Sequence, residues 1–282
     1  MNSQLSLRRR LTARLMLALV VLATLVALFP LGLILVYVVL RGLPALSLGF
    51  FLQPTGPIGV AGGGMLNAII GTLLLVTLAS LQAIPLAVLT GIYLSEYGRG
   101  RFAEVVRLLT NTLAGIPSIA AGLFAYTLVV LAMGRFSAFS GSVALAMLML
   151  PVMIRATEEG LRLVPQELRE GGLALGIPHW RTIVSVVLPT ALGSTVTGIL
   201  LAIARASGEA APLLFTAFGS PFLTFDPTQP MAALPLQIFV YATSPYKVSQ
   251  DLAWTGALTL VAMVLLTSLL ARLVAYRSQQ HR

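Results

Sequence analysis

Residues 158–189 decide the fold, and they read EEGLRLVPQELREGGLALGIPHWRTIVSVVLP. They form the one long polar segment between two apolar runs of membrane-spanning length. The apolar side chains recur at spacings of three, four and seven residues, at Leu161, Val164, Leu168 and Leu175. That periodicity predicts a short amphipathic helix that lies outside the membrane and offers one face to a partner. A solvated loop with some helical content is the alternative that the pattern leaves open.

Three residues in this stretch favour a helix that packs closely against another element. Pro165 suits the first turn of a helix, where its missing N–H costs nothing. Gly171 and Gly172 carry no side chain and would let another backbone come close.

Composition restricts the class of protein. The chain has 282 residues, of which 57% are hydrophobic and 10% charged, and the mean hydropathy is +0.94. Such a chain is an all-α membrane protein with several spans, because a β-barrel would show alternating segments of ~10 residues instead. The chain has no cysteine, which excludes disulfides, a thiol nucleophile and thiolate metal ligands. His179 and His281 lie in polar segments, and we interpret both as solvated.

Six apolar runs of spanning length lie along the chain. They cover residues 15–40, 65–94, 108–133 and 136–154, a fifth run that begins after Thr182 and reaches as far as Glu209 or beyond, and residues 252–271. The connections are a Gly/Pro-rich loop over 41–64, a charged loop over 96–107 and a Pro-rich loop over 221–250. Pro30 predicts a kink in the first run, which is longer than the apolar region of a cleaved signal peptide.

The distribution of basic residues predicts the orientation. With the N-terminus in the cytoplasm, 14 of the 18 Lys and Arg residues fall on the cytoplasmic side, as the positive-inside rule requires. They are Arg8, Arg9, Arg10, Arg14, Arg99, Arg101, Arg107, Arg155, Arg162, Arg169, Arg181, Arg272, Arg277 and Arg282. Arg41, Arg135 and Lys247 fall outside, and Arg205 falls within a span. We therefore predict six transmembrane helices with both termini in the cytoplasm.

The predicted layout follows from that orientation. Residues 1–14 form a cytoplasmic basic N-terminus, residues 15–277 the transmembrane domain and residues 278–282 a cytoplasmic tail. The loop over residues 155–185, which holds the amphipathic helix, lies in the cytoplasm.

Two ionisable residues at membrane depth form the first candidate site. Arg205 and Glu209 are four residues apart and would share one face of the fifth helix. Charged groups at this depth are costly and usually face a cavity or a partner. Arg205 would meet an anion through its planar guanidinium, with Glu209 holding it in position. An ion pair that only locks helix packing is the alternative.

The second candidate site is the sequence Gly115-Ile116-Pro117-Ser118 inside the third run. Pro117 withholds its N–H and clashes with the carbonyl of Leu113, which predicts a kink with a freed carbonyl. Such a kink is tolerated where it lines a cavity. Ser118 and Asn111 would add polar lining to such a cavity, although a packing kink without a ligand fits equally well.

The chain holds no nucleotide-binding signature. It has no GxxxxGK[ST] phosphate loop, and its single lysine, Lys247, is predicted to lie outside. Any energy that the protein requires would therefore come from a partner or from an ion gradient.

The polar stretch resembles a known motif. Glu170-Gly171-Gly172, then Gly176, then Val186-x-Leu188-Pro189 resembles the EAA loop of ABC importer permeases. The spacing matches throughout, with glycines in place of both alanines and Val186 in place of isoleucine. The resemblance implies a coupling helix that docks on a separate ATPase subunit through a set of residues in this loop. That set is Glu167, Glu170, Gly171, Gly172 and Gly176.

Longer segments resemble the A-type subunits of the phosphate-transport (Pst) permeases. The segments are MLNAIIGTLLLV, AIPLAVLTGIYLSEYG, LAGIPSIAAGLFAY, the stretch from FSAFSGSVALAMLMLP to TEEGLRLVP, and ARASGEAAPLLFTA. The resemblance implies the type I ABC importer permease fold and an anion-pathway role for Arg205 and Glu209. Where the family usually has Ala-Leu-Gly-Glu-Thr, this chain has Ala206-Ser207-Gly208-Glu209-Ala210, so the threonine hydroxyl is lost.

The resemblance implies the partners and the activity. A companion C-type permease would complete the pore, a homodimeric ATPase would bind ATP–Mg, and a binding protein would deliver inorganic phosphate from outside. The chain itself would bind no cofactor, metal or nucleic acid, and it would reside among the lipids of the bacterial inner membrane. It would be no enzyme but a transport subunit.

Two other functions remain as alternatives. One is an ABC permease for another oxyanion, such as molybdate, sulfate or phosphonate. The other is an intramembrane enzyme, such as a lipid phosphatase or acyltransferase, which would need a histidine or clustered carboxylates at an interface. The positions of His179, His281 and Glu209 offer no such cluster.

Overall fold

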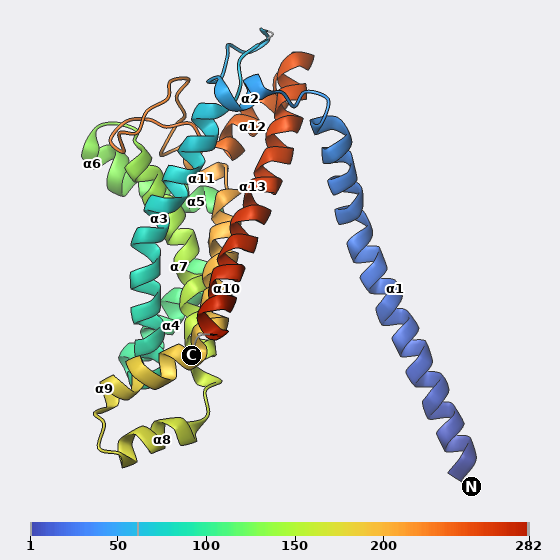
Figure 1. Cartoon of the computed structure of the whole chain (residues 1–282), viewed down its shortest axis with the longest axis vertical. Helices are drawn as coiled ribbons and strands as arrows, with labels where there is room; N and C mark the ends of the chain where they lie inside the picture. Colours follow the sequence, from blue (N-terminus) through green and yellow to red (C-terminus); the bar gives the residue numbers. More distant parts are fainter. Residues whose placement is uncertain (1, 61, 281–282) are drawn as a thin grey trace.

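The computed structural model describes residues 2–60 and 62–280, with side chains described for residues 8–60, 62–269 and 273. The side chains of Arg272, Arg277 and Arg282, which carry the predicted charge of the C-terminal tail, lie outside the described residues, as does His281. Within the described part, the chain is a bundle of helices with short and long connections (Figure 1).

Five helical segments are long and apolar enough to cross a membrane. They are α1 (Asn2–Gly42), α3 (Leu66–Ile92) with the π-helical turn Tyr93–Tyr97, α7 (Ala138–Arg162), α9 (His179–Thr182) with the π-helical turn Ile183–Val187 and α10 (Leu188–Ser207), and α13 (Lys247–Gln280). A sixth crossing results if the bent pair Arg101–Ala114 and Ser118–Met133 counts as one span. The predicted all-α membrane architecture is therefore confirmed.

The shorter helices lie at the ends of these spans or between them. They are α2 (Leu48–Leu52), α4 (Arg101–Ala114), α5 (Ser118–Ala125) with the π-helical turn Tyr126–Val130 and α6 (Leu131–Met133), α8 (Gln166–Ala174), α11 (Ala211–Leu214) and α12 (Leu234–Ala242).

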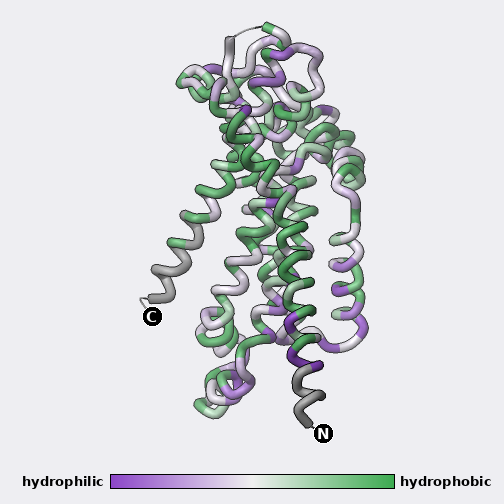
Figure 2. Tube along the Cα trace, turned by 90° about the vertical axis from the view of Figure 1, so that its right-hand side faces the viewer, coloured by the Kyte–Doolittle hydropathy of each residue, from purple (hydrophilic) through white to green (hydrophobic). Residues whose placement is uncertain are grey.

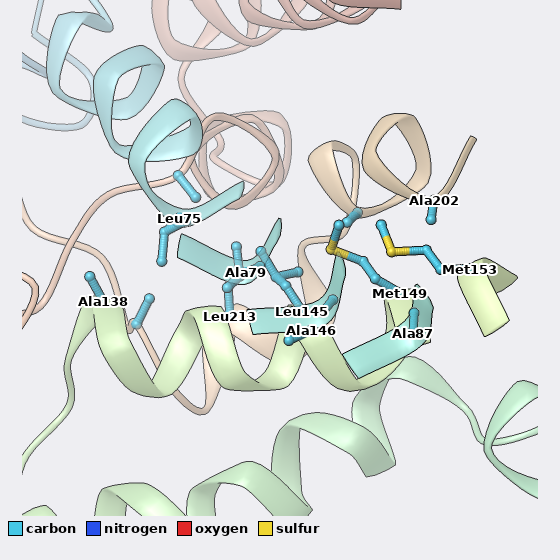
Figure 3. Packing of buried hydrophobic residues seen from close by; sticks show 14 of the residues in the cluster. Leu75, Ala79, Ala87, Ala138, Leu145, Ala146, Met149, Met153, Ala202 and Leu213 are labelled. Carbon is cyan, nitrogen blue, oxygen red and sulfur yellow. The ribbon is translucent and has the colours of Figure 1, made fainter. Parts of the chain in front are cut away.

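Small residues bring α3, α7 and α10 close together. Alanines recur every four residues on the face of α3 that meets α7, and Figure 3 shows them against Leu145, Met149 and Met153. A Cβ added at Gly198 of α10 would overlap the Cβ of Ala156 in α7. Such close approach of backbones is how helices pack in lipid, where burial of apolar surface drives little association.

The packing fixes the direction of each helix. A Cβ at Gly141, near the start of α7, would lie 3.0 Å from Leu75 near the start of α3. A Cβ at Gly91, near the end of α3, would lie 2.6 Å from Thr157 near the end of α7. Helices α3 and α7 therefore run parallel, and the segment α4–α6 between them has to return across the bundle.

The third predicted span, residues 108–133, is wrong in detail. Helix α4 begins at Arg101, inside the predicted loop over 96–107, and α5 leaves it at a bend of 110°. Pro117 has a ψ of 137° and stands before α5 rather than inside a helix, so the predicted kink is a complete break. The reason is that proline withholds its N–H and also disfavours helical geometry at Ile116.

Other predicted boundaries also change. The loop predicted over 221–250 contains α12, whose first turn accommodates Pro235. The loop predicted over 41–64 contains α2, which Ser47 caps by accepting a hydrogen bond from the N–H of Phe50. Helix α1 continues through Pro30 without a break.

Helix α1 stands apart from the rest of the molecule (Figure 1). Its contacts are at its C-terminal end, where Tyr37 packs edge-on against Trp254 of α13 and Thr255 donates to the carbonyl of Gly42. None of its spanning window is buried in this chain. Figure 2 shows the helix hydrophobic over most of its length and hydrophilic near its start, where Arg8, Arg9 and Arg10 lie.

Candidate functional site

Helix α8 lies beyond one end of the bundle, which we term the α8 end (Figure 1). The predicted amphipathic helix therefore exists, over Gln166–Ala174. Pro165 has a ψ of 142° and stands one position before the helix instead of in its first turn as predicted. Of the apolar residues in the predicted periodicity, Leu168 is the one that lies within α8. Leu161 lies in the last turn of α7, Val164 in the connection between the two helices, and Leu175 one position after α8.

Arg169 ties α8 to two other elements. Its Nε and Nη2 donate to the two carboxylate oxygens of Glu96, over 3.0 and 2.7 Å. Its Nη1 and Nη2 also donate to the carbonyls of Val164 and Leu161, over 2.7 and 2.8 Å. The two charged side chains are 12% and 3% exposed, so this is a nearly buried, bidentate ion pair. The hydrogen bonding to Glu96 raises the pKa of Arg169 above its usual value.

The predicted glycines of the loop differ in their surroundings. Gly172 is the buried residue of α8, and a Cβ there would lie 2.6 Å from the Cγ2 of Thr182 in α9. Gly171 faces open space, so the close approach predicted there involves no other part of the described chain. Gly176 has a φ of +74°, which a glycine adopts readily and which turns the chain back towards α9.

The outer surface of α8 is accessible. Glu167 and Glu170 are exposed, and neither is paired in the part of the chain that the structure describes. Leu168 and Leu173 are 40% and 49% exposed, and Leu175 is 80% exposed. Helix α8 thus presents leucines and carboxylates together on a surface that none of the described residues covers.

A second set of charges joins the ends of three helices. The carboxylate of Glu158 in α7 accepts from Arg107 of α4 over 2.9 Å and from Arg162 over 2.7 Å. Arg107 also donates to the carbonyl of Leu94, at the end of α3. Sequence reasoning did not assign Glu96, Arg107 or Glu158 to a site. The available signal was that acidic residues are scarce in this chain, with nine in all.

An open polar cavity of about 570 Å³ lies between the end of α7, α8 and the π-helical turn after α3. The Glu96–Arg169 pair, Arg99 and His179 are among its lining residues. The cavity therefore separates α8 from the ends of α3 and α7, whereas α8 contacts α9 and the π-helical turn that follows it.

Arg205 and Glu209 form the predicted ion pair, at 3.5 Å. Helix α10 ends at Ser207, so the prediction that both residues share one helix face is wrong; Glu209 belongs to the connection to α11. The Arg205 side chain is 54% exposed and Glu209 is 18% exposed. The arginine therefore reaches out of the bundle and keeps most of its donors available.

Asn111 and Ser118 lie on either side of the break at Pro117. Asn111 accepts a hydrogen bond from Arg155 of α7, which places a second exposed arginine beside the broken helix. Ser118 begins α5, whose Gly122 packs against Pro212 of α11. Among the described side chains, no hydrogen bond joins Asn111 or Ser118 to Arg205 or Glu209, although α5 contacts the segment that follows Glu209.

Comparisons with known proteins identify the chain's relatives. Residues 83–281 match the family described as "Binding-protein-dependent transport system inner membrane component". The phosphate transport system permease protein PstA of Yersinia pestis is 46% identical over 267 residues, which cover 94% of this chain and 90% of that protein. The protein of the same name from Pasteurella multocida is 44% identical over 94% of this chain and 95% of its own length.

A solved structure supports the fold. A chain of the methionine ABC transporter MetNI, in an inward-facing conformation, superposes with a TM-score of 0.59. The match covers 77% of this chain and 96% of that chain at 16% identity, so it is a likeness of fold alone.

Proposed function

The chain belongs to the binding-protein-dependent transport system inner membrane components, and within them to the PstA permeases, and on that premise we propose that it is the A-type permease subunit of an ATP-driven importer of inorganic phosphate. It is a multi-pass protein of the inner membrane. In this proposal the chain hydrolyses nothing itself, and ATP–Mg is bound by a partner ATPase.

The surface of α8 is the observation that carries the proposal. A short helix with exposed leucines and carboxylates projects from the bundle, and a buried ion pair fixes its position. Apolar side chains with a charged rim are what a docking helix offers to a groove. We assign Glu167, Glu170, Gly171, Gly172 and Gly176 to this docking segment, with an ATPase dimer as the partner.

The same family membership supports the other partners. A companion C-type permease would complete the transport pathway, and a phosphate-binding protein would dock at the end of the bundle opposite α8. In this proposal the α8 end of the bundle faces the cytoplasm. Both termini lie on the same side, as the distribution of basic residues predicts.

In this proposal, transport results when the two ends of the helix bundle open and close in alternation. Closure of the ATPase dimer on ATP displaces α8, the spans rock, and a cavity that was open to the outside opens to the cytoplasm. Arg205 supplies a cation whose donors are mostly free to meet phosphate, and Glu209 holds its guanidinium in place. A weak site suits passage, since a tight site would retain the ion. Ser118 and Asn111 border the break at Pro117 and would line the pathway beside it.

The experiment that tests the proposal is reconstitution in lipid vesicles of this chain, its companion permease, the ATPase and the binding protein. Stimulation of ATP hydrolysis by phosphate, but not by sulfate or molybdate, is the expected result. Assembly with the ATPase and stimulation by another oxyanion would keep the permease role and overturn the substrate. Failure of the chain to bind any ATPase would overturn the docking role of α8.

A further inference from the structure

Helix α8 has few attachments to the rest of the chain. On one side Gly172 packs against Thr182 of α9, the element that follows it. On the other side an open cavity separates α8 from the ends of α3 and α7, and the side chain of Arg169 bridges it. A force applied to α8 therefore reaches α3 through very few direct contacts, whereas α7 is also joined to α8 by the chain itself over residues 163–165.

Arg169 is placed where it can hold both helices at once. Glu96 lies in the π-helical turn that extends α3, and the carbonyls of Leu161 and Val164 are at the C-terminal end of α7. Carbonyls at a helix C-terminus lack partners within the helix and favour a cation. The planar guanidinium can satisfy the carboxylate and the carbonyls together, which a lysine could not do.

The two helices that Arg169 reaches are packed along their length. Gly141 approaches Leu75 at one end of the pair and Gly91 approaches Thr157 at the other, with a line of buried alanines between them. Because packed interfaces are stiff, a displacement at the α8 end of α3 and α7 is transmitted to the opposite end.

We propose that Arg169 is a positioning residue that couples α8 to the α3–α7 pair through Glu96, so that movement imposed on α8 moves both helices as one body. This inference rests on the proposed function, in which α8 is the docking helix. Arg169 touches neither phosphate nor nucleotide in this role; it determines how much transport each hydrolysed ATP produces.

The chain offers a matched control. Arg162 lies at the same end and pairs with Glu158, but both residues belong to α7 and the Arg162 side chain is 56% exposed. Replacing Arg162 by glutamine removes the same charge without cutting a link between elements.

The first test measures coupling in the reconstituted four-component assembly. Arg169→Gln and Glu96→Gln are expected to keep the ATPase bound and to lower the phosphate moved per ATP hydrolysed by about tenfold or more, a conservative figure for truncating one partner of a buried charge pair. The double variant is expected to be no worse than either single variant, because the two residues act as a unit. Arg169→Lys is expected to restore coupling only in part, and Arg162→Gln to leave it unchanged. An unchanged ratio in Arg169→Gln, or a loss of transport that only follows a loss of assembled complex, would overturn the proposal.

The second test does not depend on the substrate. The chain has no cysteine, so spin labels can be placed on exposed positions of α8 and α3 as Gln166→Cys and Leu86→Cys. In the full chain in lipid, the distance between the labels is expected to be narrowly distributed and to broaden in Arg169→Gln and Glu96→Gln, but not in Arg162→Gln. A distribution that stays narrow without the ion pair would overturn the coupling role even if the importer carries a different anion.

Discussion

The role of Arg205 in the transport pathway can be tested by replacing its charged side chain. We expect Arg205→Gln to lower phosphate uptake by roughly tenfold or more, since a hydrogen bond to a charged group contributes about 1.5–3 kcal/mol. The measurement is uptake of labelled phosphate in cells that express the variant at the wild-type level.

The control for this test is Arg135→Gln, which removes an exposed arginine at the opposite end from α8. That variant is expected to transport normally. Normal uptake by Arg205→Gln itself would show that the pair with Glu209 only locks the packing of α10 and its following turn.

At the scale of single residues, spacing in the sequence predicted the partner of Arg205 but not the partner of Arg169. The spacing of four between Arg205 and Glu209 predicted their ion pair, and the structure forms it at 3.5 Å. The role of Arg169 could not be read in the same way, because Glu96 lies 73 positions earlier in the chain and only the fold brings the two together. The pathway roles of Asn111 and Ser118 stay predictions.

The contact between α8 and α9 can be tested with two neighbouring glycines of α8. Gly172 packs against α9, and Gly171 faces open space. We expect Gly172→Ala to destabilise the chain by about 1–3 kcal/mol, because the new Cβ would overlap Thr182, whose side chain is branched and fully buried. We expect Gly171→Ala to be neutral or stabilising by up to about 1 kcal/mol, because that position is open and alanine favours a helix. Thermal unfolding of the purified chain measures both effects.

A compensating change sharpens that test. Adding Thr182→Ala to Gly172→Ala removes the Cγ2 and Oγ1 atoms that the new Cβ would overlap, and we expect part of the lost stability to return. Equal stability of the two single glycine variants would mean that α8 does not pack on α9 as described.

The exposed face of α8 gives a second test at this scale. Leu173→Asp is expected to weaken retention of the ATPase by roughly tenfold or more, because a carboxylate would replace an apolar side chain at the proposed contact. The same change at Leu223, an exposed leucine in the loop before α12, is expected to leave retention unchanged. Co-purification of the ATPase with the chain is the readout, and retention by Leu173→Asp at the wild-type level would contradict docking through this face.

At the scale of the helices, local sequence signals predicted that a helix or a bend exists better than they predicted where it begins and ends. The prediction of a short helix in this stretch is confirmed, but the periodicity placed it too broadly, because α8 covers Gln166–Ala174 and holds only Leu168 of the four apolar residues. The charges over residues 96–107 suggested a loop, but Arg107 pairs with Glu158 and its helix starts at Arg101. Pro117 predicted a bend without its size, because the angle of 110° depends on the packing of α5 against α11, which no local signal encodes.

The number of membrane crossings is a prediction about the whole molecule, and it follows from the direction in which α3 and α7 run. Because α3 and α7 run parallel, the bent segment between them has to cross the bundle, and this gives six crossings with both chain ends on the α8 side. Arg101 and Arg135, at the two ends of that segment, should then lie on opposite sides of the membrane. The same reasoning places Gln166 in the cytoplasm and Gln229, whose carbonyl accepts from the start of α7, outside.

Single cysteines at these four positions test the prediction in a chain that has none of its own. A membrane-impermeant maleimide applied to intact spheroplasts should label Arg135→Cys and Gln229→Cys, whereas Arg101→Cys and Gln166→Cys should react only after the membrane is opened. The parallel packing of α3 and α7 places Arg101 and Arg135 on opposite sides of the membrane, and the positive-inside rule assigns the side of Arg101 to the cytoplasm. Labelling of Arg101→Cys and Arg135→Cys from the same side would contradict the parallel packing of α3 and α7. The bent segment would then be re-entrant, with five crossings and the two ends of the chain on opposite faces of the membrane.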